Sequence, residues 1–421
     1  MTDTAIAAAL ESLAQMETAI SADLARLIAV DTSFPPGRGY GVFADLAEEL
    51  VTPLGFGCER ATVPEALWQA PGADGARINL IARRPTVRPA LDVYFHVDTV
   101  PLGDGWTRPP LELTREGDKL YGRGTADMKG TIAAVLAALR AAAAVDLPLA
   151  YDPCLLFCTD EEGGLYPGIR YLAEQGLLSG HLICLNGGAV PRIYAGSFGS
   201  MDFRLRFHGR TAHSGDPVGG INALEEALPV LTALADLKAE VETRAWPMPA
   251  PPHYDGAPLR SRLTITAAHA GAKGSALPGQ FDVIVNRRYA PQETAADVEA
   301  EIRRTVDDAV AGTGLLGHEI TLVGHLAPVD DPGGPHWPRW QRALAEGFGW
   351  DLNAFQAYGS STSSDLGWVQ QQGGVREILL GGLARPDRNV HAADEHTTIS
   401  DLMGLARAML LYLARDFESE T

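Results

Sequence analysis

The stretch of sequence that decides the fold is LDVYFHVDTVP, residues 91–101. Its apolar run, Leu91–Phe95, leads directly into two polar residues, His96 and Asp98. A short continuous apolar run of this kind predicts a buried parallel strand. Because residues two apart on a strand share a face, the two polar side chains are expected to point the same way.

The same pattern returns further along the chain. The runs Cys154–Cys158 and Leu182–Leu185 also predict buried parallel strands, and TDEEGG and Asn186 follow them. Two more polar clusters are Asp127 in GRGTADMKG and His391 in NVHAADE. Open α/β sheets place their chemistry outside the carboxyl ends of the strands. The pattern therefore predicts an α/β domain, with a mixed, mostly parallel sheet flanked by helices, whose polar clusters meet in one site.

A block with a different periodicity interrupts this domain. The stretch SMDFRLRFHG, residues 200–209, alternates apolar and polar residues, which is typical of an antiparallel strand with one covered face. Further strands are expected near 260–268, 280–289 and 319–323, with helices near 221–240 and 293–312. We therefore expect an inserted α+β lid or dimerisation domain at residues 192–326, between two parts of the catalytic domain at 1–191 and 327–421.

The flanking parts are expected to be rich in helices. Their predicted helices are 4–29, 41–54, 129–145, 166–176, 338–348 and 399–416. A length of 421 residues makes two domains the default, and 46% apolar with 21% charged residues fits a globular protein.

Composition also limits the partners and the compartment. A net charge of −19 argues against nucleic acid or an anionic membrane as partner and leaves a small molecule. No stretch approaches the roughly 18 consecutive apolar residues of a membrane span, and the N-terminus lacks the basic flank of a signal peptide. The four cysteines (Cys58, Cys154, Cys158 and Cys184) show no metal-type spacing. Because Cys154, Cys158 and Cys184 lie in apolar strand runs, we expect buried thiols in a reducing cytoplasm.

Histidines and carboxylates gathered at strand ends are the ligand set of a divalent metal ion such as zinc, manganese or cobalt. Of His96 and Asp98, one can bind the metal while the other orients it. The adjacent pair Glu161 and Glu162 suggests one ligand and one general base, since a carboxylate beside a metal-activated water can take and return its proton.

Each motif also has a purely structural explanation. His96 could be a hydrogen-bonded core histidine, the glutamate pair a solvated acidic loop, and His391 a helix cap. What favours a metal site is the combination, because the clusters follow successive predicted strands in the same way.

Taken together, these motifs resemble the aminoacylase, succinyl-diaminopimelate desuccinylase and glutamate carboxypeptidase family of metallopeptidases. The resemblance covers nearly the whole chain, including the inserted block. It implies that His96 binds metal, Asp98 orients it and Asp127 bridges two metals. It further implies that Glu161 is the general base and that Glu162 and His391 hold the second metal.

The resemblance also assigns two residues of the inserted domain. His213, in GRTAHSGDP, matches the histidine that polarises the scissile group in the family, often across a dimer. Arg288, in NRRYAP, matches the arginine that holds a substrate carboxylate. The family also pairs through this domain, so a homo-oligomer, at least a dimer, is expected.

The chain departs from the family pattern at three positions. Where the family has a glutamate or aspartate as the last ligand of the first metal, this chain has Asn186, followed by two glycines. A neutral amide is a much poorer ligand for a dication than a carboxylate, so we expect this ligand to be weak or lost. In the inserted block, Ser275 stands near the usual asparagine position and Asn286 replaces the usual aspartate, both at expected substrate-binding positions.

Three functions remain open on the sequence alone. The first is a metal-dependent hydrolase that cleaves a C–N bond in a small carboxylate-bearing substrate, with one strong and one weakened metal site. The second is an aminohydrolase of the nitroanthranilate type, which replaces the amino group of an activated aromatic amine by hydroxyl; His213, Arg287, Arg288 and Tyr289 would stabilise the developing anion. The third is an inactive binding protein on the same scaffold.

Overall fold

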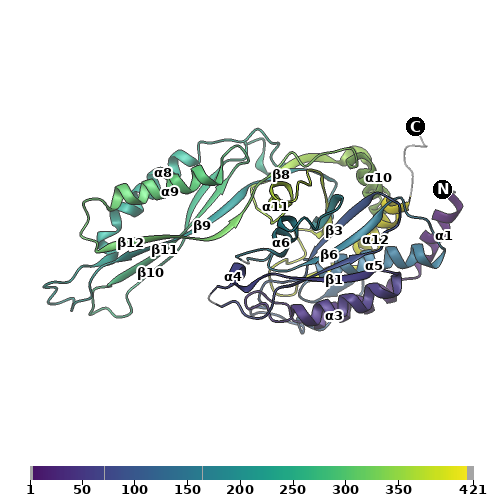
Figure 1. The fold of residues 1–421 in the computed structure, drawn as a ribbon, viewed down its shortest axis with the longest axis horizontal. Coiled ribbons are helices and arrows are strands. Elements are labelled where there is room, and N and C mark those ends of the chain that lie inside the picture. The colour runs from purple at the N-terminus through teal and green to yellow at the C-terminus, as the bar shows by residue number, and fades with distance from the viewer. Residues whose placement is uncertain (1–2, 71, 164, 415–421) are drawn as a thin grey trace. The chain divides into compact units, whose positions relative to one another are not determined.

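The computed structural model describes residues 3–70, 72–163 and 165–414, which form two compact units (Figure 1). The first unit takes its residues from Met1–Tyr194, Pro332–Ala357 and Trp368–Thr421, and the second contains Ala195–Asp331 and Tyr358–Gly367. The last of these segments was not expected in the inserted block. It belongs there because it hydrogen-bonds within the second unit, where Phe198 N donates to Ser360 O over 3.1 Å.

A six-stranded sheet forms the centre of the first unit. Its order is β1 (Gly57–Thr62), β2 (Ile78–Arg83), β6 (Asp152–Cys158), β3 (Ala90–His96), β7 (His181–Gly188) and β15 (Ile378–Ala384). The last four strands are parallel to one another, whereas β1 and β2 pair antiparallel. The apolar residues of β3, β6 and β7 are buried, so the prediction of buried parallel strands is confirmed.

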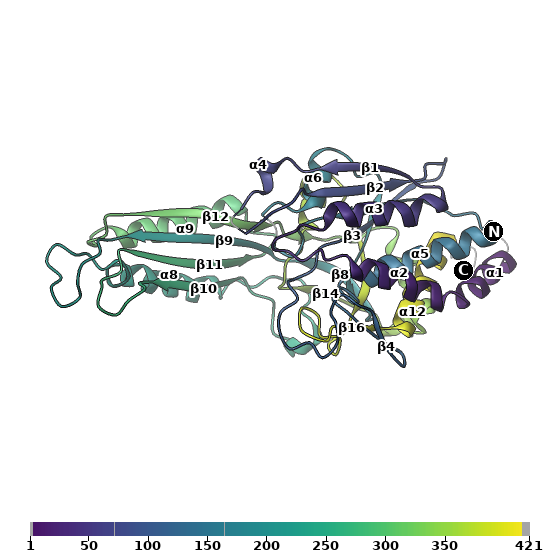
Figure 2. The same cartoon turned by 90° about the horizontal axis from the view of Figure 1, so that it is seen from below.

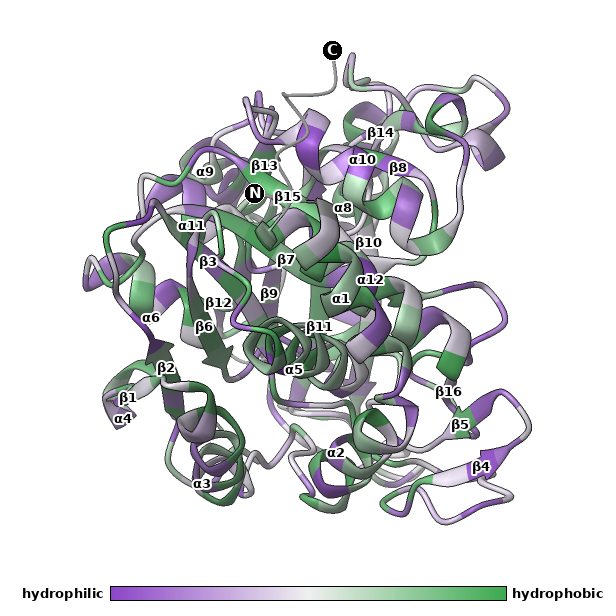
Figure 3. Cartoon of the chain, turned by 90° about the vertical axis from the view of Figure 1, so that its right-hand side faces the viewer, coloured by the Kyte–Doolittle hydropathy of each residue, from purple (hydrophilic) through white to green (hydrophobic). Residues whose placement is uncertain are grey.

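Helices flank this sheet. Figure 3 shows α6 and α11 on one side of it and α5 and α12 on the other. The helices of this part of the chain are α1 (Asp3–Ala14), α2 (Glu17–Ala29), α3 (Tyr40–Val51), α4 (Glu65–Trp68), α5 (Lys129–Ala144), α6 (Gly168–Glu174), α10 (Trp337–Phe348), α11 (Gly367–Gln371) and α12 (Ile399–Ala414). The single helix expected at 4–29 is wrong, since the chain breaks between Ala14 and Glu17 into α1 and α2.

Short strands complete the first unit. The strands β16 (His396–Thr398), β5 (Lys119–Tyr121) and β4 (Thr114–Glu116) form a small antiparallel sheet. This sheet holds the segments that flank two of the predicted site residues, Asp127 and His391, because β5 precedes one and β16 follows the other. Of the remaining short strands, β13 (Val329–Asp330) belongs to the second unit, whereas β8 (Arg192–Ser197) and β14 (Gln356–Ser360) have residues in both units.

The second unit is an antiparallel sheet covered by helices on one face. Its strand order is β10 (Arg262–Ala270), β11 (Gln280–Tyr289), β9 (Gly199–His208) and β12 (Gly317–Leu326), as Figure 2 shows. The helices α8 (Leu228–Val241) and α9 (Ala295–Val310) lie on one side, preceded by the short α7 (Ala223–Glu226). Alternate residues of β9, from Met201 to Phe207, are buried in a core with both helices, as the alternating sequence predicts.

The observed architecture therefore matches the predicted fold class, an α/β unit with a mostly parallel sheet and an inserted α+β unit. Within the described residues, no helix is both long and apolar enough to cross a membrane.

Candidate metal site

The register of the parallel strands brings the polar clusters to one level. His96, the last residue of β3, pairs with Cys158, the last residue of β6, so the TDEEGG turn begins beside it. On the other side, Tyr94 pairs with Cys184, which places Asn186 level with His96. Because neighbouring parallel strands end at the same edge, residues far apart in the sequence meet there.

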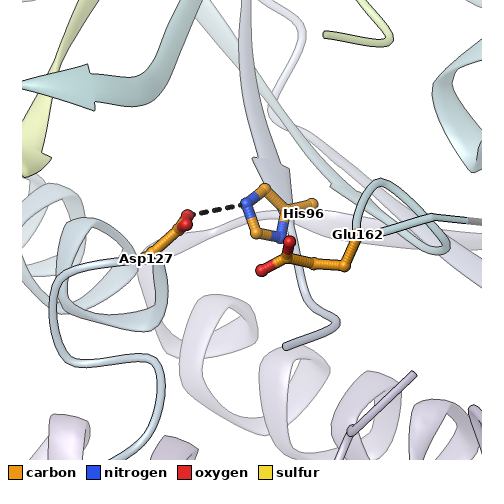
Figure 4. Close-up of side chains that lie close together, drawn as sticks. All are labelled: His96, Asp127 and Glu162. Carbon is orange, nitrogen blue, oxygen red and sulfur yellow. Dashed lines mark hydrogen bonds and ion pairs between the residues drawn. The ribbon is translucent and has the colours of Figure 1, made fainter. Parts of the chain in front are cut away.

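Three of the predicted ligands converge on one point. One ligand atom each from His96, Asp127 and Glu162 lies within 4.8 Å of the other two (Figure 4). The Nε2 atom of His96 is 3.0 Å from the Oδ1 atom of Asp127. Asp127 comes from the turn before α5, and Glu162 from the turn after β6. Nitrogen and oxygen atoms at this spacing fit a divalent transition metal.

His391 joins the same cluster from the loop between β15 and β16. Its Nε2 atom is 3.1 Å from Oδ2 of Asp127 and 3.1 Å from Oε2 of Glu162. The carboxylate of Asp127 therefore lies between two imidazoles and presents one oxygen to each. This arrangement suits a carboxylate that serves two neighbouring cation sites.

The electrostatics of the cluster favour positive charge. Burial raises the pKa of Asp127, but hydrogen bonds with His391 and His96 outweigh it and lower this pKa well below its usual value. Hydrogen bonds to Asp127 and Glu162 raise the pKa of His391 to about 10. Carboxylates that draw a proton onto a neighbouring imidazole so strongly create the negative potential that binds a dication. The residues present thus fit a metal ion.

Asp98 has a different contact from the expected one. The Nδ1 atom of His96 is 3.0 Å from the backbone carbonyl oxygen of Asp98 and 3.8 Å from its carboxylate. The other carboxylate oxygen accepts the backbone N–H of Glu162 over 2.9 Å. Burial raises the pKa of Asp98 to about 7. Asp98 therefore orients His96 with its main chain and fixes the Glu162 turn with its side chain.

Asn186 lies beside the predicted general base. Its Nδ2 atom donates a hydrogen bond of 3.3 Å to Oε1 of Glu161. The structure thus brings Asn186 and Glu161 together, with the amide oriented toward the glutamate. An aspartate or glutamate at this position could not donate such a bond.

Two buried carboxylates that support the site were not singled out in the sequence. Asp160 accepts hydrogen bonds from Tyr40 Oη (2.7 Å) and Arg77 Nε (2.8 Å), which anchors the start of the glutamate turn. Glu395 accepts four hydrogen bonds from the loop that ends in Asp127. Both residues stand inside the quoted motifs TDEEGG and NVHAADE, and their adjacency to predicted ligands is the signal that could have found them.

The second unit presents its own predicted residues. His213 is exposed, and its Nδ1 atom accepts the backbone N–H of Gly215 over 3.1 Å. In a neutral imidazole the proton is then on Nε2, which becomes a donor. Ser275 lies next to this loop, since its carbonyl oxygen accepts the N–H of Ser214.

Arg288 and Asn286 share one face of β11. The Nε atom of Arg288 donates to Oδ1 of Asn286 over 3.2 Å, and its Nη1 atom donates to Oγ of Ser363 over 2.8 Å. Asn286 is held in turn by Ser200 and Asp202. Sequence reasoning missed Ser363, which lies in the serine-rich segment 360–364.

Comparisons with known proteins agree with this description. The model of peptidase family M20/M25/M40 matches residues 93–415. Succinyl-diaminopimelate desuccinylase from Acidiphilium cryptum is 31% identical over 80% of this chain and 86% of its own. Acetylornithine deacetylase from Klebsiella pneumoniae is 30% identical over 68% of this chain and 64% of its own. A solved di-peptidase, Dug1p from Saccharomyces cerevisiae, superimposes with a TM-score of 0.79 at 16% identity over 99% of both chains.

The family match spans most of the chain, and the cluster of His96, Asp127 and Glu162 supplies a candidate ligand group inside it. The resemblance inferred from the sequence is confirmed, as is the prediction of an enzyme, which leaves the inactive binding protein without support. The chain belongs to peptidase family M20/M25/M40 and is a metal-dependent hydrolase.

Proposed function

We propose that this hydrolase cleaves the amide C–N bond of a small, carboxylate-bearing substrate, with Glu161 as the general base. The observation that carries the proposal is the position of Asp127 between His96 and His391, with Glu162 completing the cluster. The names of the curated relatives, a desuccinylase and a deacetylase, describe removal of an acyl group and support an N-acyl amino acid as the substrate class.

The ligand set supports one strong and one weakened metal site. Asp127, Glu162 and His391 would hold one ion. The other ion would have His96, Asp127 and the neutral amide of Asn186 as its ligands, and would be bound more weakly. A bound divalent ion supplies a Lewis acid and lowers the pKa of a coordinated water to about 7. Zinc, manganese and cobalt all fit nitrogen and oxygen ligands without a thiolate.

Glu161 is proposed to move the proton. It takes a proton from the water whose oxygen attacks the carbonyl carbon, and returns it to the nitrogen as the C–N bond breaks. The hydrogen bond from Nδ2 of Asn186 to Oε1 of Glu161 would hold the carboxylate of this base in one orientation. Asp160, held by Tyr40 and Arg77, fixes the turn that carries this base.

The second unit offers the groups that such a substrate requires. Arg288 makes two hydrogen bonds among the described residues, so its guanidinium keeps further donors for a carboxylate, and Ser363 lies beside it. His213 presents a donor at Nε2, which suits the oxygen of a polarised amide carbonyl. Ser275 would contribute by holding the loop of His213 through its carbonyl oxygen, and Asn286 by holding the side chain of Arg288.

A substrate series tests this proposal. We expect release of free amine from N-succinyl or N-acetyl amino acids in the presence of Mn²⁺ or Zn²⁺, and little turnover of the same compounds with the carboxylate blocked as an amide. The Arg288→Gln variant should raise KM about 10- to 100-fold, as loss of a charged hydrogen bond of 1.5–3 kcal/mol implies. Arg206→Gln, which removes an ion pair with Asp282 in the same unit, is the matched control and should leave KM unchanged.

Asn186 also favours a second candidate, the aminohydrolase. An activated aromatic ring can accept the attacking water oxygen with less electrophilic assistance than an amide. A weakened first metal site is therefore compatible with the aminohydrolase reaction. Ammonia release from an aminobenzoate, without amine release from N-acyl amino acids, would establish this candidate in place of amide hydrolysis.

We further propose that the second unit joins two copies of the chain into at least a dimer, because the family resemblance assigns pairing to the inserted domain. Light scattering coupled to size-exclusion chromatography should give at least twice the 44.8 kDa chain mass. A mass of one chain would contradict the proposal.

A further inference from the structure

Glu395 joins the loops that carry two of the proposed metal ligands. It stands four residues after His391, directly before β16, and is 1% exposed. Its backbone carbonyl oxygen accepts the N–H of Gly122, at the start of the loop that ends in Asp127. The two loops are therefore in contact through main chain as well as side chain.

Both carboxylate oxygens of Glu395 are used by that loop. Oε2 accepts Nη1 of Arg123 over 2.8 Å and the backbone N–H of Gly124 over 3.0 Å. Oε1 accepts the backbone N–H groups of Ala126 over 3.0 Å and Asp127 over 3.1 Å. A carboxylate with four donors in a dry interior, one of them charged, fixes the path of the backbone around it.

The last of these bonds reaches the residue at the centre of the cluster. The N–H of Asp127 is held by Glu395, while the carboxylate of Asp127 faces His96 and His391. Rotation of the Asp127 backbone would move both carboxylate oxygens away from the imidazoles. Metal ligands depend on such outer contacts, whose loss typically lowers metal affinity about 10- to 100-fold.

We propose that Glu395 is a positioning residue that sets the metal affinity of the site by locking the Asp127 loop to the His391 loop. This inference rests on the proposed function, since it assumes that Asp127 and His391 bind metal. Glu395 touches neither substrate nor the ion; it acts through the main chain of Asp127.

The test is the dissociation constant of the full chain for Mn²⁺. It is measured by titration calorimetry and by the electron paramagnetic resonance signal of free Mn²⁺. Glu395→Gln places an amide among four donors and should weaken Mn²⁺ binding about 10- to 100-fold. Glu395→Asp keeps the charge but is too short to reach all four donors, so the same weakening is expected. If Glu395→Gln does not fold, the Mn²⁺ affinity of Glu395→Asp tests the proposal in its place.

Asp92→Asn is the matched control, because Asp92 is a buried carboxylate in the same unit that accepts the backbone N–H groups of Ser179 and Gly180. Melting temperatures of the metal-free proteins show whether the variants lose comparable stability. The proposal predicts weaker Mn²⁺ binding in the Glu395 variants alone.

Wild-type affinity in a folded Glu395 variant, or an equal loss in Asp92→Asn, would overturn this inference and leave the metal site intact. Absence of Mn²⁺ binding by the wild-type chain would instead overturn the proposed metal site itself, and the role of Glu395 with it.

Discussion

The two ends of the six-stranded sheet both bury charged and polar side chains, but they use them differently. At the amino ends of the strands, His181 stacks on His336 with 3.7 Å between ring centroids, and its Nε2 lies 2.5 Å from the hydroxyl of Tyr412. His336 is hydrogen-bonded to Glu377, and Asp92 accepts a hydrogen bond from the N–H of Ser179. Each of these groups thus has a partner supplied by the protein.

At the carboxyl ends, the side chains converge instead of pairing off. Atoms of His96, Asp127 and Glu162 lie within 4.8 Å of one another, and His391 reaches two of these residues. Burial and unusual pKa values occur at both ends of the sheet. What distinguishes the site is several ligand atoms aimed at one point, so substitutions at the two ends should have separable effects.

The largest effect is expected from Glu161→Gln at the carboxyl end. Removing the proposed general base should lower kcat about 10²- to 10⁴-fold, because proton transfer contributes that much to such reactions. The melting temperature and the metal content should stay at the wild-type values. Steady-state kinetics on an N-acyl amino acid measure the loss, and His181→Gln, which alters the amino end, is the control that should keep kcat. A Glu161→Gln variant with wild-type turnover would show that another group moves the proton.

The next effect is expected from His391→Ala. His391 is proposed to bind the metal directly, and loss of a direct ligand should matter at least as much as loss of an outer contact, so Mn²⁺ affinity should fall by about 100-fold or more. Titration calorimetry measures this change. Asp92→Asn, at the amino end of the sheet, is again the control and should keep the wild-type affinity. Equal affinities in wild type and His391→Ala would remove His391 from the ligand set.

How far the sequence predicted this structure depends on the residues involved. The strands β3, β6 and β7 were predictable because each is an uninterrupted apolar run, and their polar ends located His96, Glu161, Glu162 and Asn186. The alternating pattern of β9 likewise predicted the antiparallel sheet. The uninterrupted apolar runs and the alternating pattern both reflect which side chains are buried, and this can be inferred from the order of apolar and polar residues.

Other features were not predictable because they depend on contacts between distant segments. The break between α1 and α2 has no proline or glycine to announce it in LAQME. Glu395 stands in the NVHAADE motif, so the sequence could mark the residue, but the Asp127 N–H that it binds lies 268 residues away and could not be named as its partner. The contact of Ser363 with Arg288 and the hydrogen bond between Asn186 and Glu161 likewise join distant segments.

The smallest effect is expected from His181→Gln at the amino end, and it concerns stability. Burial, together with the charges of His336 and Arg339, lowers the pKa of His181 from 6.5 to about 3. The unfolded chain therefore binds more protons between these pH values, so this contribution is complete above pH 6.5 and is lost as the pH falls toward 3. Between pH 7 and pH 5 the loss is about 2 kcal/mol of unfolding free energy.

Urea unfolding at pH 7 and pH 5 checks this expectation. The difference between the two pH values should be about 2 kcal/mol smaller in His181→Gln than in wild type. Its Mn²⁺ affinity should be unchanged, because His181 is at the other end of β7 from Asn186. An identical pH dependence in both proteins would mean that His181 is not held neutral in the folded state.

We propose that Asn186 leaves this enzyme with one strong and one weakened metal site. Elemental analysis of wild type and Asn186→Glu, each after dialysis against metal-free buffer, measures the number of metals that each chain retains. We expect about one retained metal per chain in the wild type and about two in the variant, where a carboxylate would complete the first site. Two metals retained by the wild-type chain would contradict it.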